Sequence, residues 1–382
     1  MRAGSGRTVS DFPFTALRRR PDIEADNLFA YDATDRLLLD TMVEHLPASG
    51  AVAVVGDTHG ALTLGAQHRG ARKVHVHQDP VTSERALDAN AALLGLSGEY
   101  AFRPLGPDLF DGATLVLLQL PRSLEALEEI AWHIAAAASP NVTVLAGGRV
   151  KHMTPAMNQI LGRYFGAVTA GLARQKSRVL TATGALPVGA CPFPTTAEYD
   201  VGLPRPLQLR AYGGTFGGAK LDPGTRLLLQ HLHHAPPAAS AVDLGCGNGT
   251  IAAYLALTRP SLLVTATDTS AAAVAATRAT AEANGVGGQV VVVREDGLSG
   301  RSDAGDELIV LNPPFHSGHT VHAGIALKLF AEAGRALRPG GELWAVWNSH
   351  LHYRQALKRL VGPTRQVARD PRFTVTVSTR TR

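Results

Sequence analysis

The amino-acid sequence predicts an α/β fold of two tandem, doubly wound domains. Three observations lead to it. Short apolar strands alternate with amphipathic helices, as in parallel sheets covered by helices. This alternation stops and restarts once along the chain. The length of 382 residues, with 45% hydrophobic composition, suffices for two domains that each bury a core.

The first series of elements occupies the first 145 residues. Its strands are nearly continuous in apolar residues, which is typical of parallel strands buried on both faces. The helices show the apolar spacing of one buried face. Helices are predicted over 27–46, 83–94 and 124–138, and strands over 51–55, 73–76, 114–120 and 141–145.

Prolines and glycines interrupt the pattern in the middle of the chain. The run over 178–182 and the prolines Pro187, Pro192 and Pro194 after it indicate a linker or strand-rich bridge. We therefore expect a first domain over 1–195 and a second over 196–382.

The second series repeats the alternation. Asn284-Gly285 and Pro339-Gly340-Gly341 are predicted to end two of its helices. Helices are predicted over 225–233, 250–257, 270–283 and 324–337, and strands over 241–244, 263–267, 289–293, 307–311, 342–347 and 373–377.

The two series align as copies of one unit. Placing Gly60 opposite Gly249 brings Val54 opposite Asp243. Asp79 follows Val54 by 25 positions, as Asp268 follows Asp243, and the elements keep the same order. We infer a duplicated fold whose first copy lacks the polar residues of the second.

A glycine-rich loop follows the first strand of the second series. Gly245, Gly247 and Gly249 allow a sharp turn and a close ligand, and the helix that follows offers free N–H groups. A dinucleotide loop would space its last glycine one residue further. Asp243 lies two residues before the first glycine and favours a cationic ligand over a diphosphate. S-adenosylmethionine, with a sulfonium and an amino group, is such a ligand.

Acidic residues end the next two strands of the same series. Asp268 is placed to accept the ribose hydroxyls, and Asp296 with Gly297 to contact the adenine. Asn248 lies within the loop and completes the expected cofactor-binding set. An ordinary strand–helix turn is the alternative, and the neighbouring Glu295 is an alternative to Asp296.

The motif Asn312-Pro313-Pro314-Phe315 follows the fourth strand and predicts a clamp for a planar amine. An exocyclic amine is a poor nucleophile because its lone pair is delocalised into the ring. Acceptors at the Asn312 side chain and the Pro313 carbonyl would draw that lone pair out of the ring, Pro314 would stiffen the turn, and Phe315 would stack on the base. Asn312 would also border the cofactor. His316 is expected to contact the substrate rather than to act as a base. The alternative is a plain turn with a core aromatic.

Composition excludes several classes of protein. Two cysteines cannot form a disulfide framework, and no Cys/His spacing predicts a metal site. No apolar run has the length of a membrane span, so we expect a cytoplasmic protein. The net charge of +5 permits a nucleic-acid partner. Arg18-Arg19-Arg20 and the end Arg380-Thr381-Arg382 are the basic runs that could touch phosphates.

With these residues in view, the chain resembles the ribosomal RNA guanine-N2 methyltransferases over nearly its whole length, the large-subunit member more than the small-subunit member. The Asp243–Gly249 loop and the Asn312–His316 motif carry the resemblance. Gly214-Thr215-Phe216 and Leu221-Asp222 fit a segment before the loop, although Gly217 stands where the family has serine.

The resemblance implies two Rossmann-like methyltransferase domains, the N-terminal copy degenerate and helping to hold RNA. It implies transfer of a methyl group from S-adenosylmethionine to guanine N2 in ribosomal RNA, naked or in a precursor subunit. It also implies a monomer or weak dimer. Three alternatives stay open: methylation of adenine N6, methylation of a protein glutamine amide, and a non-catalytic RNA-binding assembly factor.

Overall fold

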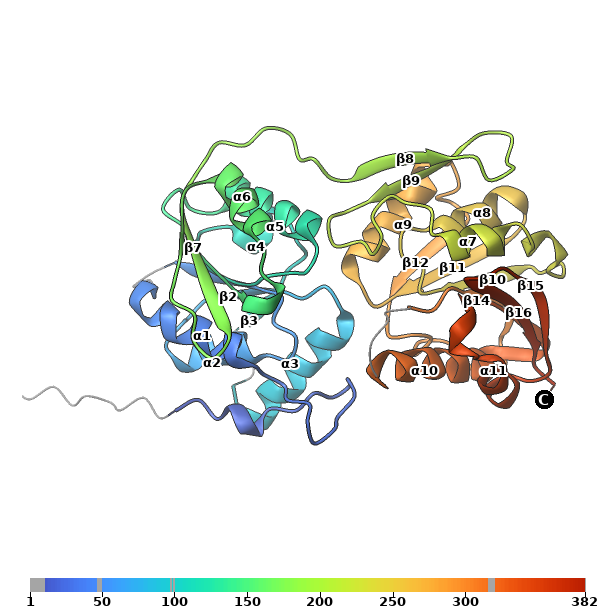
Figure 1. Cartoon of the computed structure of the whole chain (residues 1–382), viewed down its shortest axis with the longest axis horizontal. Helices are drawn as coiled ribbons and strands as arrows, with labels where there is room; N and C mark the ends of the chain where they lie inside the picture. Colours follow the sequence, from blue (N-terminus) through green and yellow to red (C-terminus); the bar gives the residue numbers. More distant parts are fainter. Residues whose placement is uncertain (1–10, 47–49, 97, 99, 315–319, 382) are drawn as a thin grey trace, which may run out of the picture. The chain divides into compact units, whose positions relative to one another are not determined.

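The structure, a computed structural model, describes residues 11–46, 50–96, 98, 100–314 and 320–381. The chain folds into two compact units, Met1–Cys191 and Pro192–Arg382 (Figure 1). This division falls a few residues before the boundary expected from the sequence.

The first unit is built on a seven-stranded sheet with the order β3-β2-β1-β4-β5-β7-β6. Parallel pairs join β1 to both β2 and β4, so the chain reverses its direction of travel across the sheet at β1. The strands are β1 (Ala51–Val55), β2 (Val74–His77), β3 (Tyr100–Phe102), β4 (Ala113–Gln119), β5 (Thr143–Arg149), β6 (Phe165–Ala170) and β7 (Ser177–Ala185).

The second unit repeats this sheet strand for strand, in the order β12-β11-β10-β13-β14-β16-β15. The duplication expected from the sequence is thereby confirmed at the level of topology. The strands are β10 (Ser240–Leu244), β11 (Leu263–Asp268), β12 (Val290–Arg294), β13 (Asp306–Leu311), β14 (Leu337–Asn348), β15 (Thr364–Arg369) and β16 (Phe373–Thr379).

Both sheets are mixed, which corrects the expectation of purely parallel sheets. In the first unit β7 runs antiparallel to β5 and β6, and in the second β16 runs antiparallel to β14 and β15. The sequence pattern missed this because apolar runs do not report strand direction. An antiparallel hairpin of β8 (Thr195–Tyr199) and β9 (Leu207–Ala211) begins the second unit.

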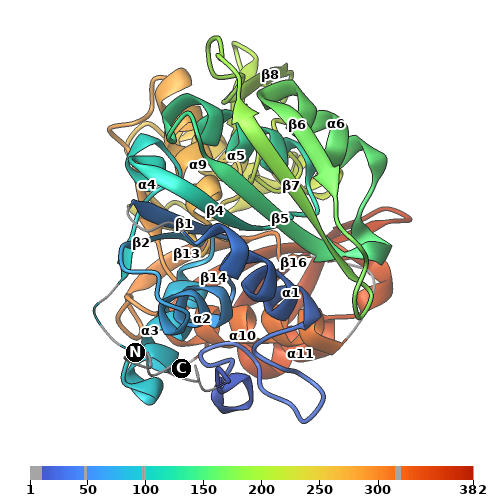
Figure 2. The same ribbon diagram turned by 90° about the vertical axis from the view of Figure 1, so that its left-hand side faces the viewer.

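Helices cover both faces of each sheet. In the first unit one core lies under α1, α2 and α3 and a second under α4, α5 and α6, on opposite sides of the sheet in Figure 2. The helices are α1 (Ala33–Met42), α2 (Ala61–His68), α3 (Val81–Leu94), α4 (Pro107–Phe110), α5 (Leu124–Ala137) and α6 (Pro155–Tyr164).

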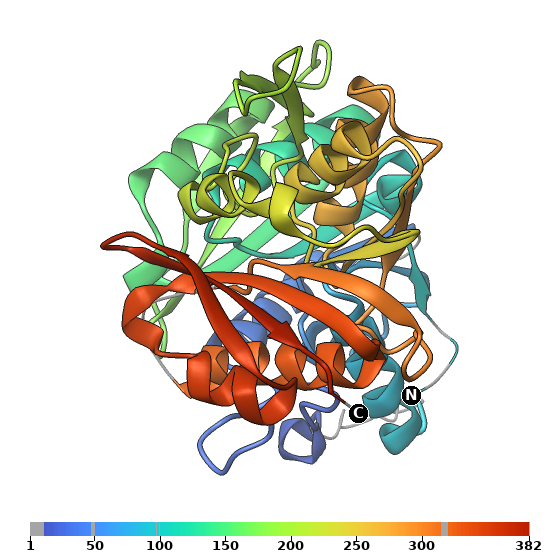
Figure 3. The same cartoon turned by 90° about the vertical axis from the view of Figure 1, so that its right-hand side faces the viewer.

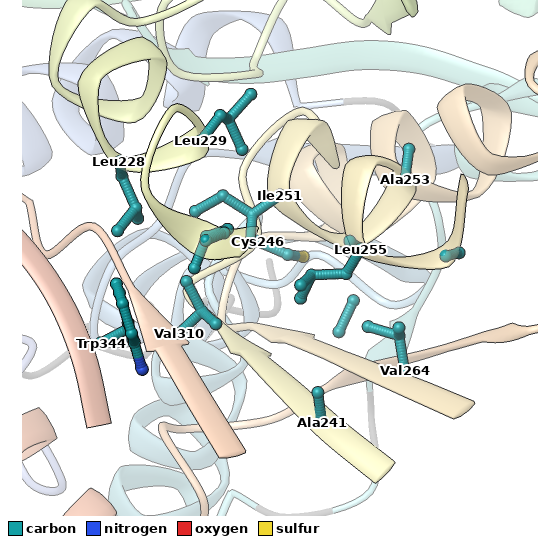
Figure 4. Close-up of a cluster of buried hydrophobic side chains, with 14 of the residues drawn as sticks. Leu228, Leu229, Ala241, Cys246, Ile251, Ala253, Leu255, Val264, Val310 and Trp344 are labelled. Carbon is teal, nitrogen blue, oxygen red and sulfur yellow. The ribbon is translucent and has the colours of Figure 1, made fainter. Parts of the chain in front are cut away.

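In the second unit the yellow to gold helices α7, α8 and α9 lie on one side of the sheet and the orange-red α10 and α11 on the other (Figure 3). Leu228, Ile251 and Val310 meet in the core under α7 and α8 (Figure 4). The helices are α7 (Pro223–Leu229), α8 (Thr250–Thr258), α9 (Ala271–Ala283), α10 (Thr320–Ala336) and α11 (Arg354–Leu360). Among the described residues, no helix has the length and apolar character needed to cross a bilayer.

Several predicted boundaries are wrong for local reasons. The helix predicted over 27–46 begins at Ala33, because Asp32 forms a capping box with Asp35 there. The run over 178–182, expected as a linker or strand-rich bridge, is strand and lies inside β7 of the first sheet. Pro339-Gly340-Gly341 lies within β14 at a shift of its register, with Gly340 at φ +81°, while α10 already ends at Ala336.

Candidate active site

The glycine loop and the asparagine motif leave the same edge of the second sheet. β10 and β13 are parallel neighbours, and Leu244 pairs with Leu311, the last residue of each strand. Gly245 and Asn312, the residues directly after this pair, therefore begin at neighbouring points on the edge of the sheet. The next strand after β10, β11, lies on its other side, so this is the point where the sheet order reverses. Open α/β sheets bind ligands at such points, beyond the carboxyl ends of the strands.

The three loop glycines serve two different purposes. All three have left-handed backbones, with φ of +73° at Gly245, +56° at Gly247 and +78° at Gly249. A Cβ added at Gly245 or Gly247 would meet open space. A Cβ at Gly249 would lie 2.8 Å from the Cα of Thr277 in α9. The first two glycines leave room for a ligand, and the third lets α8 and α9 pack closely.

Asp243 lies behind the loop rather than on its open side. Its side chain is fully buried, and Oδ2 accepts a hydrogen bond of 2.9 Å from the Ala252 N–H in the first turn of α8. It replaces the helix cap that Gly249 cannot supply. Burial, helped by the charge of Asp268, raises the pKa of Asp243 to about 7.

Asp268 holds the loop from the end of β11. Its Oδ2 accepts from the Gly247 N–H at 3.1 Å and its Oδ1 from the Ser270 N–H at 2.9 Å. The residue is half-buried. Carboxylate oxygens each have two acceptor lone pairs, so a carboxylate is a suitable acceptor for the neighbouring hydroxyls of a ribose.

Asp296 and its neighbour Glu295 have different surroundings in the structure. Glu295 is buried and accepts from the Gly300 N–H at 2.7 Å, so it stabilises the turn. Asp296 is half-buried and forms an ion pair of 2.5 Å with Lys328 of α10. A Cβ at Gly297 would clash with the Glu332 carboxylate, which accepts from the N–H of the next residue, so this turn requires glycine.

Asn248 connects two segments of the protein. Its Nδ2 donates to the carbonyls of Gly218 and Lys220, at 3.1 and 3.0 Å, and its Oδ1 accepts from the hydroxyl and N–H of Thr250. The side chain is thus engaged within the protein, and it fixes the segment before α7 against the glycine loop.

Asn312 is held by two side chains of α7. Its Nδ2 donates to Oδ1 of Asp222 at 2.9 Å and to Oγ1 of Thr225 at 2.8 Å. An ionised carboxylate only accepts hydrogen bonds, so it must face the amide nitrogen. The amide oxygen is directed away from α7 as a result.

That amide oxygen, Asn312 Oδ1, is buried and has no hydrogen-bond partner in the part of the chain that the structure describes. A buried polar atom left unpaired costs about 1–3 kcal/mol. A ligand that donates an N–H there would remove this cost. In the same motif Pro313 is buried and Pro314 exposed, whereas Phe315 and His316 lie outside the described residues.

Reasoning from the sequence alone missed the roles of Asp222, Thr225 and Lys328. Asp222 had a local signal, since an aspartate before Pro223 is a typical helix cap, and it does cap α7 through the Thr225 N–H. Nothing in the sequence connected it with Asn312, 90 positions away. No cluster of three or more metal-binding side chains occurs among the described residues.

The corresponding edge of the first unit has different chemistry. Val54 replaces the buried acid, and Asp57, within the loop, accepts from the N–H groups of Gly60 and Thr63 at 2.9 and 2.8 Å. Asp57 thus satisfies the Thr63 N–H from within the loop, whereas Asp243 satisfies the equivalent Ala252 N–H from the end of its strand. Gln119 is the counterpart of Asn312, because it comes directly after Leu118, which pairs with Val55 as Leu311 pairs with Leu244. Its amide donates to Asp35 at 2.6 Å.

Fold and candidate site together define a methyltransferase of the Rossmann-like α/β class. A family model described as "Methyltransferase small domain" matches residues 206–377, and the "RLMG N-terminal domain" model matches residues 7–185. The chain belongs to the ribosomal RNA large subunit methyltransferase G family.

Curated relatives carry that family's name. One from Streptomyces coelicolor is 36% identical over 365 residues, covering 94% of this chain and 96% of the relative. One from Pseudomonas paraeruginosa is 36% identical over 370 residues, covering 95% and 97%. A solved T. thermophilus 16S rRNA N2 methyltransferase, in complex with AdoMet and guanosine, shares the fold, with a TM-score of 0.74 at 20% identity over 91% of this chain and 92% of that one. The predicted family and fold class are confirmed.

Proposed function

We propose that the chain transfers a methyl group from S-adenosylmethionine to the exocyclic N2 amine of a guanine in ribosomal RNA. One observation carries the proposal: Asn312, just beyond the end of β13 and beside the glycine loop, has a buried amide oxygen with no partner among the described residues. An acceptor of this kind suits a substrate that donates N–H. The names of the relatives supply the ribosomal RNA, and the solved neighbour's guanosine complex supplies the base.

The chain's own residues activate and aim the amine. Asn312 Oδ1 accepts one N–H of the amine, and the Pro313 carbonyl accepts the other. Both bonds draw the nitrogen towards tetrahedral geometry, which frees its lone pair for attack. A new N–C bond forms as the S–C bond breaks, S-adenosylhomocysteine leaves, and the extra proton passes from nitrogen to solvent. No base is needed before attack.

The residues that would hold S-adenosylmethionine fit it by shape and charge. The open space beside Gly245 and Gly247 admits a ligand against the backbone. Asp268 would accept the ribose hydroxyls, and Asp296, with its partner Lys328, would border the adenine. Bound there, S-adenosylmethionine supplies the activated methyl group. We assign Asp243 and Asn248 to shaping the loop rather than to direct contact.

We further propose that the first unit helps to hold the RNA. The arginines suggested by the sequence are largely engaged: Arg19 and Arg20 pair with Asp22 and Glu24, and Arg380 donates to backbone carbonyls of Arg335 and Leu337. The charge that supports RNA binding lies elsewhere.

It lies at the carboxyl edge of the first sheet, in a group of three cations: Arg122 after β4, and Arg149 and Lys151 at the end of β5. None of the three has an acidic partner within the described residues. Desolvation, and then the positive charges of these three residues, lower the pKa of His152 among them. Such a group attracts phosphates. We propose cytoplasmic action, without a metal, on naked ribosomal RNA or a precursor subunit.

The proposal is tested by incubating the protein with radiolabelled S-adenosylmethionine and deproteinised ribosomal RNA from cells that lack it. Protein from the same cells and free nucleosides serve as competing acceptors. After digestion to nucleosides, label in N2-methylguanosine is the expected result. Label in methylated adenosine, label confined to protein, or none in any acceptor would overturn the proposal and favour one of the three alternatives.

A further inference from the structure

We propose that Asp222 and Thr225 are positioning residues that set which chemical groups the acceptor site admits. They fix the amide of Asn312 in one orientation, so that the site presents an oxygen and selects acceptors that donate N–H. The inference rests on the proposed function, and it assigns the selectivity for the amine to the first turn of α7.

The geometry gives the amide only one favourable orientation. Oδ1 of Asp222 accepts from both the Asn312 amide and the Thr225 N–H, at 2.9 and 2.8 Å. Turning the amide over would bring its oxygen against that carboxylate oxygen, which would lose the amide donor and keep only the Thr225 N–H. Thr225 alone could not prevent this, because its hydroxyl can donate as well as accept.

Neighbouring packing holds the carboxylate in place. Thr225 is buried. A Cβ added at Gly224 would lie 2.9 Å from the Phe373 ring and 3.1 Å from Asp222 Oδ1. Glycine at 224 therefore lets the first turn of α7 approach β16 while keeping room for the carboxylate.

The orientation decides which bases are accepted. Guanine offers an amine, whereas a base with a carbonyl in its place offers a second oxygen. Two buried oxygens facing each other would both stay unpaired, a penalty that corresponds to a preference of roughly tenfold or more. Asn312 supplies the contact, and Asp222 with Thr225 determines its polarity.

The test compares substitutions that keep the helix cap. Asp222→Ser still caps α7, but its hydroxyl can donate, so the amide is free to turn. Asp222→Asn keeps a carbonyl oxygen able to occupy the Oδ1 position. Thr225→Val removes the hydroxyl, and Thr225→Ser restores it. Asp32→Ser, at the equivalent cap of α1, is the matched control.

With ribosomal RNA as substrate, we expect Asp222→Ser to lower kcat about 100-fold, the effect of a mispositioned contact. Thr225→Val should lower kcat roughly tenfold, which corresponds to the loss of about one hydrogen bond. Asp222→Asn, Thr225→Ser and Asp32→Ser should stay within about threefold of wild type. Cofactor affinity should be unchanged throughout. Equal losses in kcat and cofactor affinity for Asp222→Ser would mean a merely structural role and overturn the inference.

A second measurement reads the polarity directly. Calorimetry in the presence of S-adenosylhomocysteine compares binding of guanosine, inosine and xanthosine, at a mildly acidic pH where xanthine is neutral. Wild type should prefer guanosine over xanthosine, and Asp222→Ser should lose most of that preference. An unchanged preference contradicts the inference alone, whereas wild type that methylates no guanine contradicts the proposed function itself.

Discussion

At the scale of single residues, the account depends on one unpaired oxygen. Asn312 Oδ1 has no partner among the described residues, while the amide nitrogen beside it has two. Replacing Asn312 with alanine removes this acceptor and leaves the glycine loop intact. We expect kcat to fall about 10²–10³-fold, as when one positioned hydrogen-bonding group is lost from an active site. Affinity for S-adenosylmethionine should hardly change.

The matched control is Gln119→Ala, at the equivalent position of the first unit. It should leave kcat near the wild-type value. If Asn312→Ala loses cofactor binding as severely as activity, the residue belongs to the cofactor site and its assigned role is wrong.

Asp243 gives a second prediction, about pH. Its pKa is raised to about 7 in the folded protein, from about 3.9 in unfolded chains. The protonated form is favoured by folding, so this stabilising effect is complete below about pH 4 and is lost as the pH rises through 7. Asp243→Asn keeps an oxygen for the Ala252 N–H and has no charge to bury.

The stability of Asp243→Asn relative to wild type should therefore increase between pH 4 and pH 8, by on the order of 2–4 kcal/mol. Urea unfolding without cofactor, repeated across this range, measures it. A difference in unfolding free energy that stays constant with pH would contradict the raised pKa.

At the scale of elements, two glycines of the loop allow the cost of a left-handed backbone to be measured apart from the cost of disturbed packing. Gly245 and Gly249 have similar left-handed backbones, but only Gly249 lies against α9. Gly245→Ala should lower the unfolding free energy by about 1–2 kcal/mol, the cost of the left-handed backbone. Gly249→Ala should lower it by about 1–3 kcal/mol more, because Thr277 must shift. Denaturant unfolding of the cofactor-free protein compares them, and equal losses would refute the packing role.

The helices and strands also show how much of the fold could be predicted from the sequence. The β1 and β10 runs, the glycine loop and Asp268 could be placed because glycine spacing and apolar runs are local signals. The Asp222–Asn312 contact could not, since it depends on how α7 packs near the end of β13. The run over 178–182 was open to two interpretations, linker or strand, because its small and polar residues lack a clear period, and the Asp32 cap starts the first helix later than its apolar spacing suggested.

At the scale of the whole molecule, the two units share one topology but differ in chemistry. In the first, Asp57 accepts from the Gly60 and Thr63 N–H groups, and the cations Arg122, Arg149 and Lys151 gather at the edge that corresponds to the candidate site of the second unit. We propose that the second copy carries out the reaction and that the first binds the substrate.

This division predicts a specific effect of salt. The double variant Arg122→Gln/Arg149→Gln should bind ribosomal RNA more weakly. The slope of log affinity against log salt concentration should shrink by about 1–2 for the lost phosphate contacts. Arg72→Gln/Lys73→Gln removes the same charge at the opposite edge of the same sheet, just before β2, and should change the slope little. Equal effects of the two pairs, measured by filter binding, would show that only net charge matters.

The most direct test of the central claim is an experimental structure of the protein with S-adenosylhomocysteine and guanosine. The account predicts a single cofactor, lying against Gly245 and Gly247. It also predicts the guanine amine nitrogen within hydrogen-bond distance, about 3 Å, of Asn312 Oδ1. A cofactor on the loop of the first unit, or a base bound with its amine turned away from Asn312, would contradict it.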